Sequence, residues 1–280
     1  MRKLIDTAHI KVVLAAIVWG SSGVFIKYLG LPAPLIAFFR VGIPVAVLAG
    51  WFIYHREPIF VNGIRLMLVA SAVNALRLIF YFVGYLNAPI GNAVIILYTW
   101  PVFAVLMGYF FLNEPMPPRN IGLLVLAMAG IALVFSGKPF SVENKVFIGM
   151  GAMLLSALLN AASVTLFKHQ SPRFSPLKIL FFQNFLGVLV FLPFVFIHGN
   201  ELTFQKTTTA SLYALLVGVA GYGLFFFALR SIRASTASFL AYIEVVSAVL
   251  FGVWVFNEVL SLHEIAGGSM IILASVMLKK

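Results

Sequence analysis

Long apolar runs separated by short connections are the feature that most constrains how this chain can fold. A helix needs about 20 mostly apolar residues to cross a bilayer, and such runs follow one another through most of the 280 residues. The composition agrees, with 62% hydrophobic residues, 10% charged residues and a mean hydropathy of +1.07. This pattern predicts an all-α polytopic membrane protein that leaves no room for a soluble domain.

Hydropathy predicts ten transmembrane helices, with Pro, Gly and charged residues marking the ends of the apolar runs. Their expected ranges are 10–29, 33–54, 66–86, 90–112, 120–136, 148–168, 177–198, 210–230, 235–256 and 262–278. The connections between them are brief, so almost every residue either crosses the bilayer or turns at its surface.

The distribution of basic residues explains the net charge of +11. If the N-terminus is cytoplasmic, 13 of the 19 Lys and Arg residues fall in inner segments and four in outer ones. Cytoplasmic segments of membrane proteins carry such an excess. We therefore expect a multi-pass protein of the cell inner (plasma) membrane with both termini cytoplasmic, in contact with the lipid bilayer and without a nucleic-acid partner.

Several classes of chemistry have no residues to support them. The chain has no Cys, so disulfides, thiolate metal ligands and a Cys nucleophile are excluded. Its five His residues all fall near predicted span ends, and no Ser-centred elbow or phosphate loop occurs. We expect no enzyme activity, no cofactor and no metal site.

The second half of the chain repeats the first. Residues 94–115 align with residues 238–259 at a spacing of 144, and residues 22–27 align with 163–168 at a spacing of 141. The first alignment places Tyr98 on Tyr242, Trp100 on Glu244 and Asn113-Glu114 on Asn257-Glu258. We predict two five-helix halves, residues 1–137 and 138–280. Because five is odd, the second half would be inverted, as in secondary transporters with a binding site between the repeats.

A known family shares these short motifs. The matching residues are Trp19-Gly20-Ser21-Ser22, Lys27, Arg40, Pro101, Leu112-Asn113-Glu114-Pro115, Glu244-Val245 and Asn257-Glu258. On these residues the chain resembles the drug/metabolite transporter superfamily, in particular the EamA-type ten-helix transporters. The resemblance implies export of an amino acid, a nucleotide precursor or another small metabolite, or flipping of a lipid-linked sugar, through a cavity lined by spans one, three, four, six, eight and nine. Val245 stands where the family usually has Pro, so a hinge at that proline is not expected here.

Two opposite charges inside spans are the main candidate substrate-binding residues. Glu244 lies about 13 Å into span nine and Arg77 about 18 Å into span three, at 1.5 Å per residue. Buried charges of this kind are costly and often functional. Glu244 would hold an amine or a proton, and Arg77, with Asn74 one turn before it, a carboxylate or phosphate. A hydrogen-bonded structural carboxyl and an Arg77–Glu244 ion pair are the structural alternatives.

Aromatic and polar residues complete the predicted site. Tyr98, Trp100, Tyr242 and Tyr222 would present rings to a substrate, and Asn160 would add an amide. Three other span residues are expected to serve structure. Arg40 would satisfy carbonyls near a helix end, and Glu114 and Glu258 would anchor the ends of their spans.

The functional hypothesis from sequence is a secondary-active or facilitative exporter that works by alternating access. Its substrate would be a small zwitterionic or amphipathic metabolite such as an amino acid. A carrier of cations, such as polyamines or a nucleoside-like sulfonium compound, and a flippase of a lipid-linked substrate are the alternatives. Coupling to protons, exchange and facilitation all remain open, as do a monomer and a homodimer.

Overall fold

The computed structural model describes residues 2–88, 96–136, 144–257 and 261–278, and these residues are helical or lie in turns and loops, with no strand among them. The first half contains α1 (Arg2–Gly20), α2 (Ser22–Leu29), α3 (Ala33–Tyr54), α4 (Arg65–Asn87), α6 (Trp100–Leu112) and α7 (Pro118–Phe135). The second half contains α8 (Asn144–Gln170), α9 (Pro176–His198), η1 (Gly199–Glu201), α10 (Phe204–Tyr213), the π-helix η2 (Ala214–Gly221), α11 (Tyr222–Leu229), α12 (Ala234–Leu240), α13 (Ile243–Phe256) and α14 (Leu262–Leu278).

These helices make the protein a multi-pass membrane protein. Within the described ranges, seven helical runs are long and apolar enough to cross a bilayer, and α6, α7 and α14 supply shorter apolar helices. Most helices lie in the predicted ranges to within about four residues, but α1 begins at Arg2 and α10 at Phe204, eight and six residues before the expected starts. Residues 90–95 of the fourth predicted span fall outside the described part of the chain. The prediction of an all-helical membrane protein is confirmed.

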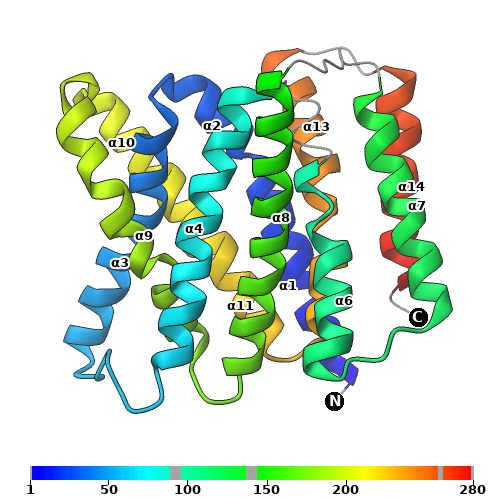
Figure 1. Ribbon diagram of the computed structural model, residues 1–280, viewed down its shortest axis with the longest axis horizontal. Coiled ribbons are helices and arrows are strands. Elements are labelled where there is room, and N and C mark those ends of the chain that lie inside the picture. The colour runs from blue at the N-terminus through cyan, green and yellow to red at the C-terminus, as the bar shows by residue number, and fades with distance from the viewer. Residues whose placement is uncertain (1, 89–95, 137–143, 258–260, 279–280) are drawn as a thin grey trace.

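Helices of the first half pack mainly on helices of the second. α4 packs on α8 and α9, α3 packs on α9, and α1 packs on α11 and α13. α7 and α14 form a pair at one side of the bundle (Figure 1). Their backbones approach closely at Gly130 and Gly267, where a Cβ added to Gly130 would lie 2.7 Å from the Gly267 carbonyl oxygen. Small residues permit such contacts, which drive helix association in lipid.

Several helices are interrupted inside the bundle. The first apolar run breaks at Ser21, whose hydroxyl donates to the Val18 carbonyl, and others break at residues 98–99 and 241–242. In the eighth run, residues 214–221 form a π-helix between α10 and α11. Irregular backbone is tolerated at membrane depth where it is buried or lines a cavity, and π-helical turns often occur at functional sites. A functional site is therefore expected in the space between these interruptions.

The ends of α6 and α13 adopt the same backbone conformation, 144 residues apart. Asn113 and Asn257 both have φ of 53°, and their N–H groups donate to the carbonyls of Gly108 and Gly252. Asn tolerates this left-handed conformation better than most residues, which suits it to end a helix. The two Asn residues aligned in the sequence thus have a shared structural role, whereas Glu258 lies outside the described residues.

Candidate functional site: a buried central cavity

A buried cavity of about 110 Å³ lies between the interrupted helices. Its charged lining residues are Arg40, Arg77 and Glu244. Its other polar lining residues and its rings are Ser22, Asn160, Gln183, Trp19, Tyr81, Tyr98, Trp100, Tyr213, Tyr222 and Phe225. The cavity thus combines many aromatic groups with a few charges, which is the usual make-up of a small-molecule site.

The structure brings six of the eight predicted site residues to this cavity, namely Glu244, Arg77, Tyr98, Trp100, Tyr222 and Asn160. Asn74 and Tyr242 do not line it. Tyr242 is fully buried in a second core cluster, and its hydroxyl lies 3.2 Å from the Met128 sulfur. Glu244, two residues later, lines the cavity instead, because nearby positions on a helix project from different faces.

Glu244 lies in the first turn of α13, just after the interruption at residues 241–242. The Tyr98 side chain, next to the matching interruption in the first half, hydrogen-bonds its carboxyl group. The positive end of a helix dipole stabilises a carboxylate at this position. The two interruptions that the repeat aligns therefore meet at this acidic group.

Arg77 is held by Asn74, one turn earlier on α4. The Arg77 Nε donates to Asn74 Oδ1 over 3.0 Å, and Asn74 Nδ2 donates to the Gln183 carbonyl over 2.7 Å. Arg77 is only 5% exposed, and α8 fixes its backbone through a hydrogen bond from Ser156 to the Arg77 carbonyl. Asn74 therefore positions the guanidinium toward the cavity without lining it.

Arg40 lies in the cavity, not at the helix-end carbonyls expected from the sequence. Its guanidinium donates to the Tyr222 hydroxyl and lies 5.2 Å from the centre of that ring. Gly218 lets the π-helix pack closely on α3 beside Arg40, because a Cβ at that position would lie 2.9 Å from the Arg40 carbonyl oxygen. In the sequence the position that matches Arg40 in the second half, 142 residues later, is Phe182, so the repeat does not require an Arg there. The sequence signal that could have found Arg40 was its position inside a span, seven residues after the predicted start at residue 33.

Trp19 and Gln183 are cavity residues that were not among the predicted set. The Trp19 ring packs between Tyr222 and Phe225, with centroid distances of 4.7 and 5.2 Å. Both Trp19 and Gln183 are 7% exposed, and Trp19 Nε1 and Gln183 Oε1 are buried without a hydrogen-bond partner in the described part of the chain. Buried polar atoms are normally paired, so these two are exceptions, and the Trp19 N–H faces Gly221, where an added Cβ would lie 2.8 Å from Nε1.

Two side chains hold the turn between α11 and α12 in place by hydrogen bonds. Glu114, 8% exposed, accepts hydrogen bonds from the Ala234 and Ser235 backbone N–H groups over 2.6 and 3.0 Å and from the Ser235 hydroxyl. Lys168 Nζ donates to the carbonyls of Leu229 and Ile232 over 2.6 and 2.7 Å. We call these contacts the α11–α12 clamp. The clamp agrees with the expected anchoring role of Glu114 and lies at the end of the bundle that also carries the α3–α4 and α8–α9 connections (Figure 1).

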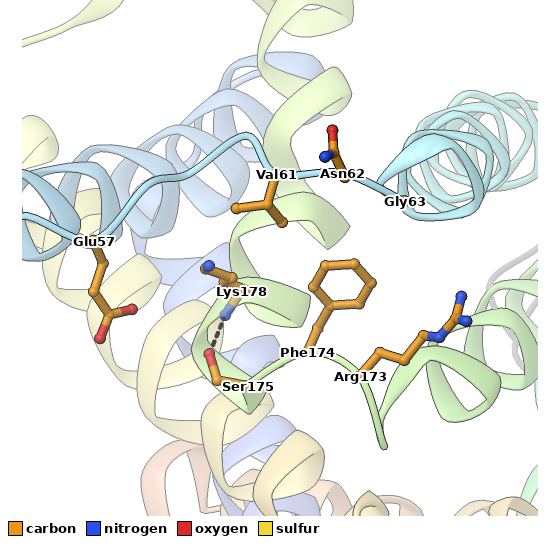
Figure 2. Close-up of a pocket in the computed structure, with 8 residues that line it drawn as sticks. All are labelled: Glu57, Val61, Asn62, Gly63, Arg173, Phe174, Ser175 and Lys178. Carbon is orange, nitrogen blue, oxygen red and sulfur yellow. Dashed lines mark hydrogen bonds between the residues drawn. The ribbon is translucent and has the colours of Figure 1, made fainter.

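A second, larger hollow of about 500 Å³ lies between the α3–α4 and α8–α9 connections. Figure 2 shows Glu57, Arg173 and Lys178 around Phe174 and Val61, with Ser175 Oγ accepting from the Lys178 N–H at the start of α9. Glu57 and Arg173 are exposed, so water satisfies their charges. In the central cavity Arg77 is buried and Arg40 and Glu244 are half-buried, so it is the stronger candidate site.

Comparisons with known proteins place the chain among transporters. The EamA-like transporter family matches residues 6–136 and, separately, residues 147–279. An uncharacterized transporter of Archaeoglobus fulgidus is 25% identical over 261 residues, covering 89% of each chain. An S-adenosylmethionine uptake transporter of Rickettsia conorii is 26% identical over 254 residues, covering 85% of this chain and 80% of the relative. One crystal structure superposes with a TM-score of 0.84 at 15% identity, covering 98% of this chain and 96% of the other, which shows a shared fold.

Proposed function

Because the chain belongs to the EamA-like transporter family, we propose that it carries a small metabolite with both an acidic and an amino group, such as an amino acid, by alternating access. The observation that supports this most directly is the presence of Arg77 and Glu244 in one buried cavity between interrupted helices. Arg77 would bind the carboxylate with two parallel hydrogen bonds. Glu244 would bind the amine, and the surrounding rings would enclose the remainder.

The proposed movement is a rocking of two inverted five-helix halves, residues 1–137 and 138–280, about this cavity. In the present conformation the α11–α12 clamp would close the cytoplasmic side. The clamp joins the two halves, because Glu114 follows α6 and the capped helix α12 belongs to the second half. Breaking and remaking it would accompany each transport cycle, and export is the direction that we propose.

The volume of the cavity favours a compact substrate. At about 110 Å³ it is smaller than the 300–1,000 Å³ typical of pockets for drug-sized ligands. A single amino acid suits this size better than a nucleoside derivative does. A cationic sulfonium substrate remains the second candidate, because the Rickettsia relative is named for S-adenosylmethionine uptake and Glu244 with its rings could hold a cation.

The proposal is tested by substitution of the two charged residues. A metabolite that raises the melting temperature of the purified protein identifies a ligand, and its uptake is then measured in proteoliposomes. We expect Arg77→Ala and Glu244→Gln each to lower uptake at least about tenfold, since each leaves an opposite charge on the substrate unpaired. Arg65→Ala, which removes an exposed Arg at the start of α4, is the matched control and should transport normally. If folded, inserted Arg77→Ala and Glu244→Gln proteins transport like the parent, the assignment fails.

The same vesicles separate coupled from uncoupled transport. Uptake that does not respond to an imposed pH gradient would eliminate proton coupling, and facilitation or exchange would then remain.

A further inference from the structure

The charges in the central cavity do not balance. Arg40 and Arg77 contribute two positive charges and Glu244 one negative charge. Both guanidiniums are close enough to Glu244 and to each other to interact electrostatically. Within the part of the chain that the structure describes, however, no salt bridge joins either of them to Glu244. An Arg side chain stays charged in proteins, so the cavity holds an excess of positive charge.

In the described part of the chain, both guanidiniums donate their hydrogen bonds to neutral groups. Arg40 donates to the Tyr222 hydroxyl, and Arg77 donates to the Asn74 amide oxygen. Besides the two guanidiniums and Tyr222, the titratable side chains that line the cavity are Tyr81, Tyr98, Tyr213 and Glu244. Hydrogen bonds to neutral dipoles orient a guanidinium but leave its charge uncompensated, which is costly at membrane depth.

Two residues that line the cavity each have one buried polar atom with no hydrogen-bond partner in the described part of the chain. Trp19 Nε1 is a donor, and Gln183 Oε1 is an acceptor. The Trp19 N–H faces Gly221, because a Cβ added there would lie 2.8 Å from Nε1, and neither atom is accessible from the cavity. The excess of positive charge is therefore the observation that points to a ligand with acidic oxygens.

We propose that the transported molecule is an amino acid with an acidic side chain, which carries two carboxylates and one ammonium group. One carboxylate would bind Arg77 and the other Arg40, while the ammonium group would lie near Glu244. This inference rests on the proposed function and narrows its substrate class, because a neutral zwitterion would leave one guanidinium without an anion. It also assigns Arg40 as the residue that selects for the second acidic group.

Matched ligands that differ only in that group provide the test. Glutamate and glutamine, and aspartate and asparagine, have nearly the same size and differ by one negative charge. Binding to the purified protein is followed by tryptophan fluorescence, because two of the four Trp residues, Trp19 and Trp100, line the cavity. All titrations are made at equal ionic strength. We expect the parent protein to bind glutamate or aspartate at least about tenfold more tightly than the corresponding amide.

Three variants distinguish a role of Arg40 in substrate selectivity from a purely structural role. Arg40→Gln should remove most of this preference and leave the affinity for the amide member within about threefold of the parent's. Arg40→Lys keeps a positive charge and should retain most of the preference. Tyr222→Phe removes the hydroxyl that Arg40 contacts but keeps its ring, and it should also retain the preference.

The inference is overturned if the parent binds the amides as tightly as the acids, or if none of the four ligands binds. An equal loss of affinity for both members in Arg40→Gln also overturns it, because that pattern indicates a structural role. These results would leave the proposed function standing, since that function is judged by transport in the Arg77 and Glu244 variants. If those variants transport normally, the proposed function fails whatever the selectivity of Arg40.

Discussion

Replacement of Glu114 by Ala should open the side of the protein that carries the α11–α12 clamp, which is the cytoplasmic side in the proposed orientation. In the structure Glu114 accepts three hydrogen bonds at the first turn of α12, from the Ala234 N–H, the Ser235 N–H and the Ser235 hydroxyl. Loss of a helix N-cap typically costs about 1 kcal/mol, and a hydrogen bond to a charged group contributes about 1.5–3 kcal/mol. Because such contributions are not additive, we expect Glu114→Ala to destabilise the closed side by about 3 kcal/mol in total. That corresponds to roughly a hundredfold change in the equilibrium between closed and open forms.

A single introduced cysteine reports this change, since the natural chain contains none. Val164 lines the cavity on α8, one turn before Lys168, and is 7% exposed. In inside-out vesicles, a membrane-impermeant maleimide should label Val164→Cys slowly in the parent background and much faster with Glu114→Ala. Ser235→Ala removes only one of the three hydrogen bonds and should give a smaller increase.

Glu57→Ala is the matched control. It removes an exposed carboxylate from the same end of the bundle and should leave the labelling rate unchanged. If Glu114→Ala labels no faster than the parent while both proteins are folded, the α11–α12 clamp does not hold its side of the cavity closed.

Two further predictions concern stability. Gly267→Ala should lower the melting temperature, because its Cβ would lie 2.7 Å from a Val134 methyl group and separate α7 from α14, whereas Gly122→Ala, with open space around it, should not. Asn113→Ala and Asn257→Ala should each cost about 1 kcal/mol, because both positions have φ of 53°. Asn→Gly at either position should be tolerated. Equal melting temperatures within either comparison would contradict the packing or backbone argument concerned.

The sequence predicted the helical membrane fold and several of the lining residues for a common reason. In lipid every backbone polar group must be satisfied within the segment, so a long apolar run has few alternatives to a helix. The same argument made Glu244 and Arg77 conspicuous, because a charge at that depth is costly. Their roles in binding remain predictions, as do the inverted arrangement of the two halves and the orientation of the termini.

Other features depend on how the helices pack and could not be read from hydropathy. Tyr242 was expected beside a substrate because its ring lies near mid-membrane depth in one of the two best-matched spans, but it packs among apolar side chains near Met128. The repeat fixes which residues are equivalent, whereas the rotation of each helix about its axis decides which of them face the cavity. Asn74 likewise supports Arg77 and does not reach the cavity.

The apolar runs and the two costly charges were determined by the sequence alone, because bilayer thickness and desolvation act on each segment separately. The third charge in the cavity was decided by the tertiary structure. Arg40 contacts Tyr222 where Gly218 of the π-helix lets the second half approach α3 closely at Arg40 and Pro44. That approach is a contact between residues more than 170 positions apart, and no periodicity within either segment encodes it.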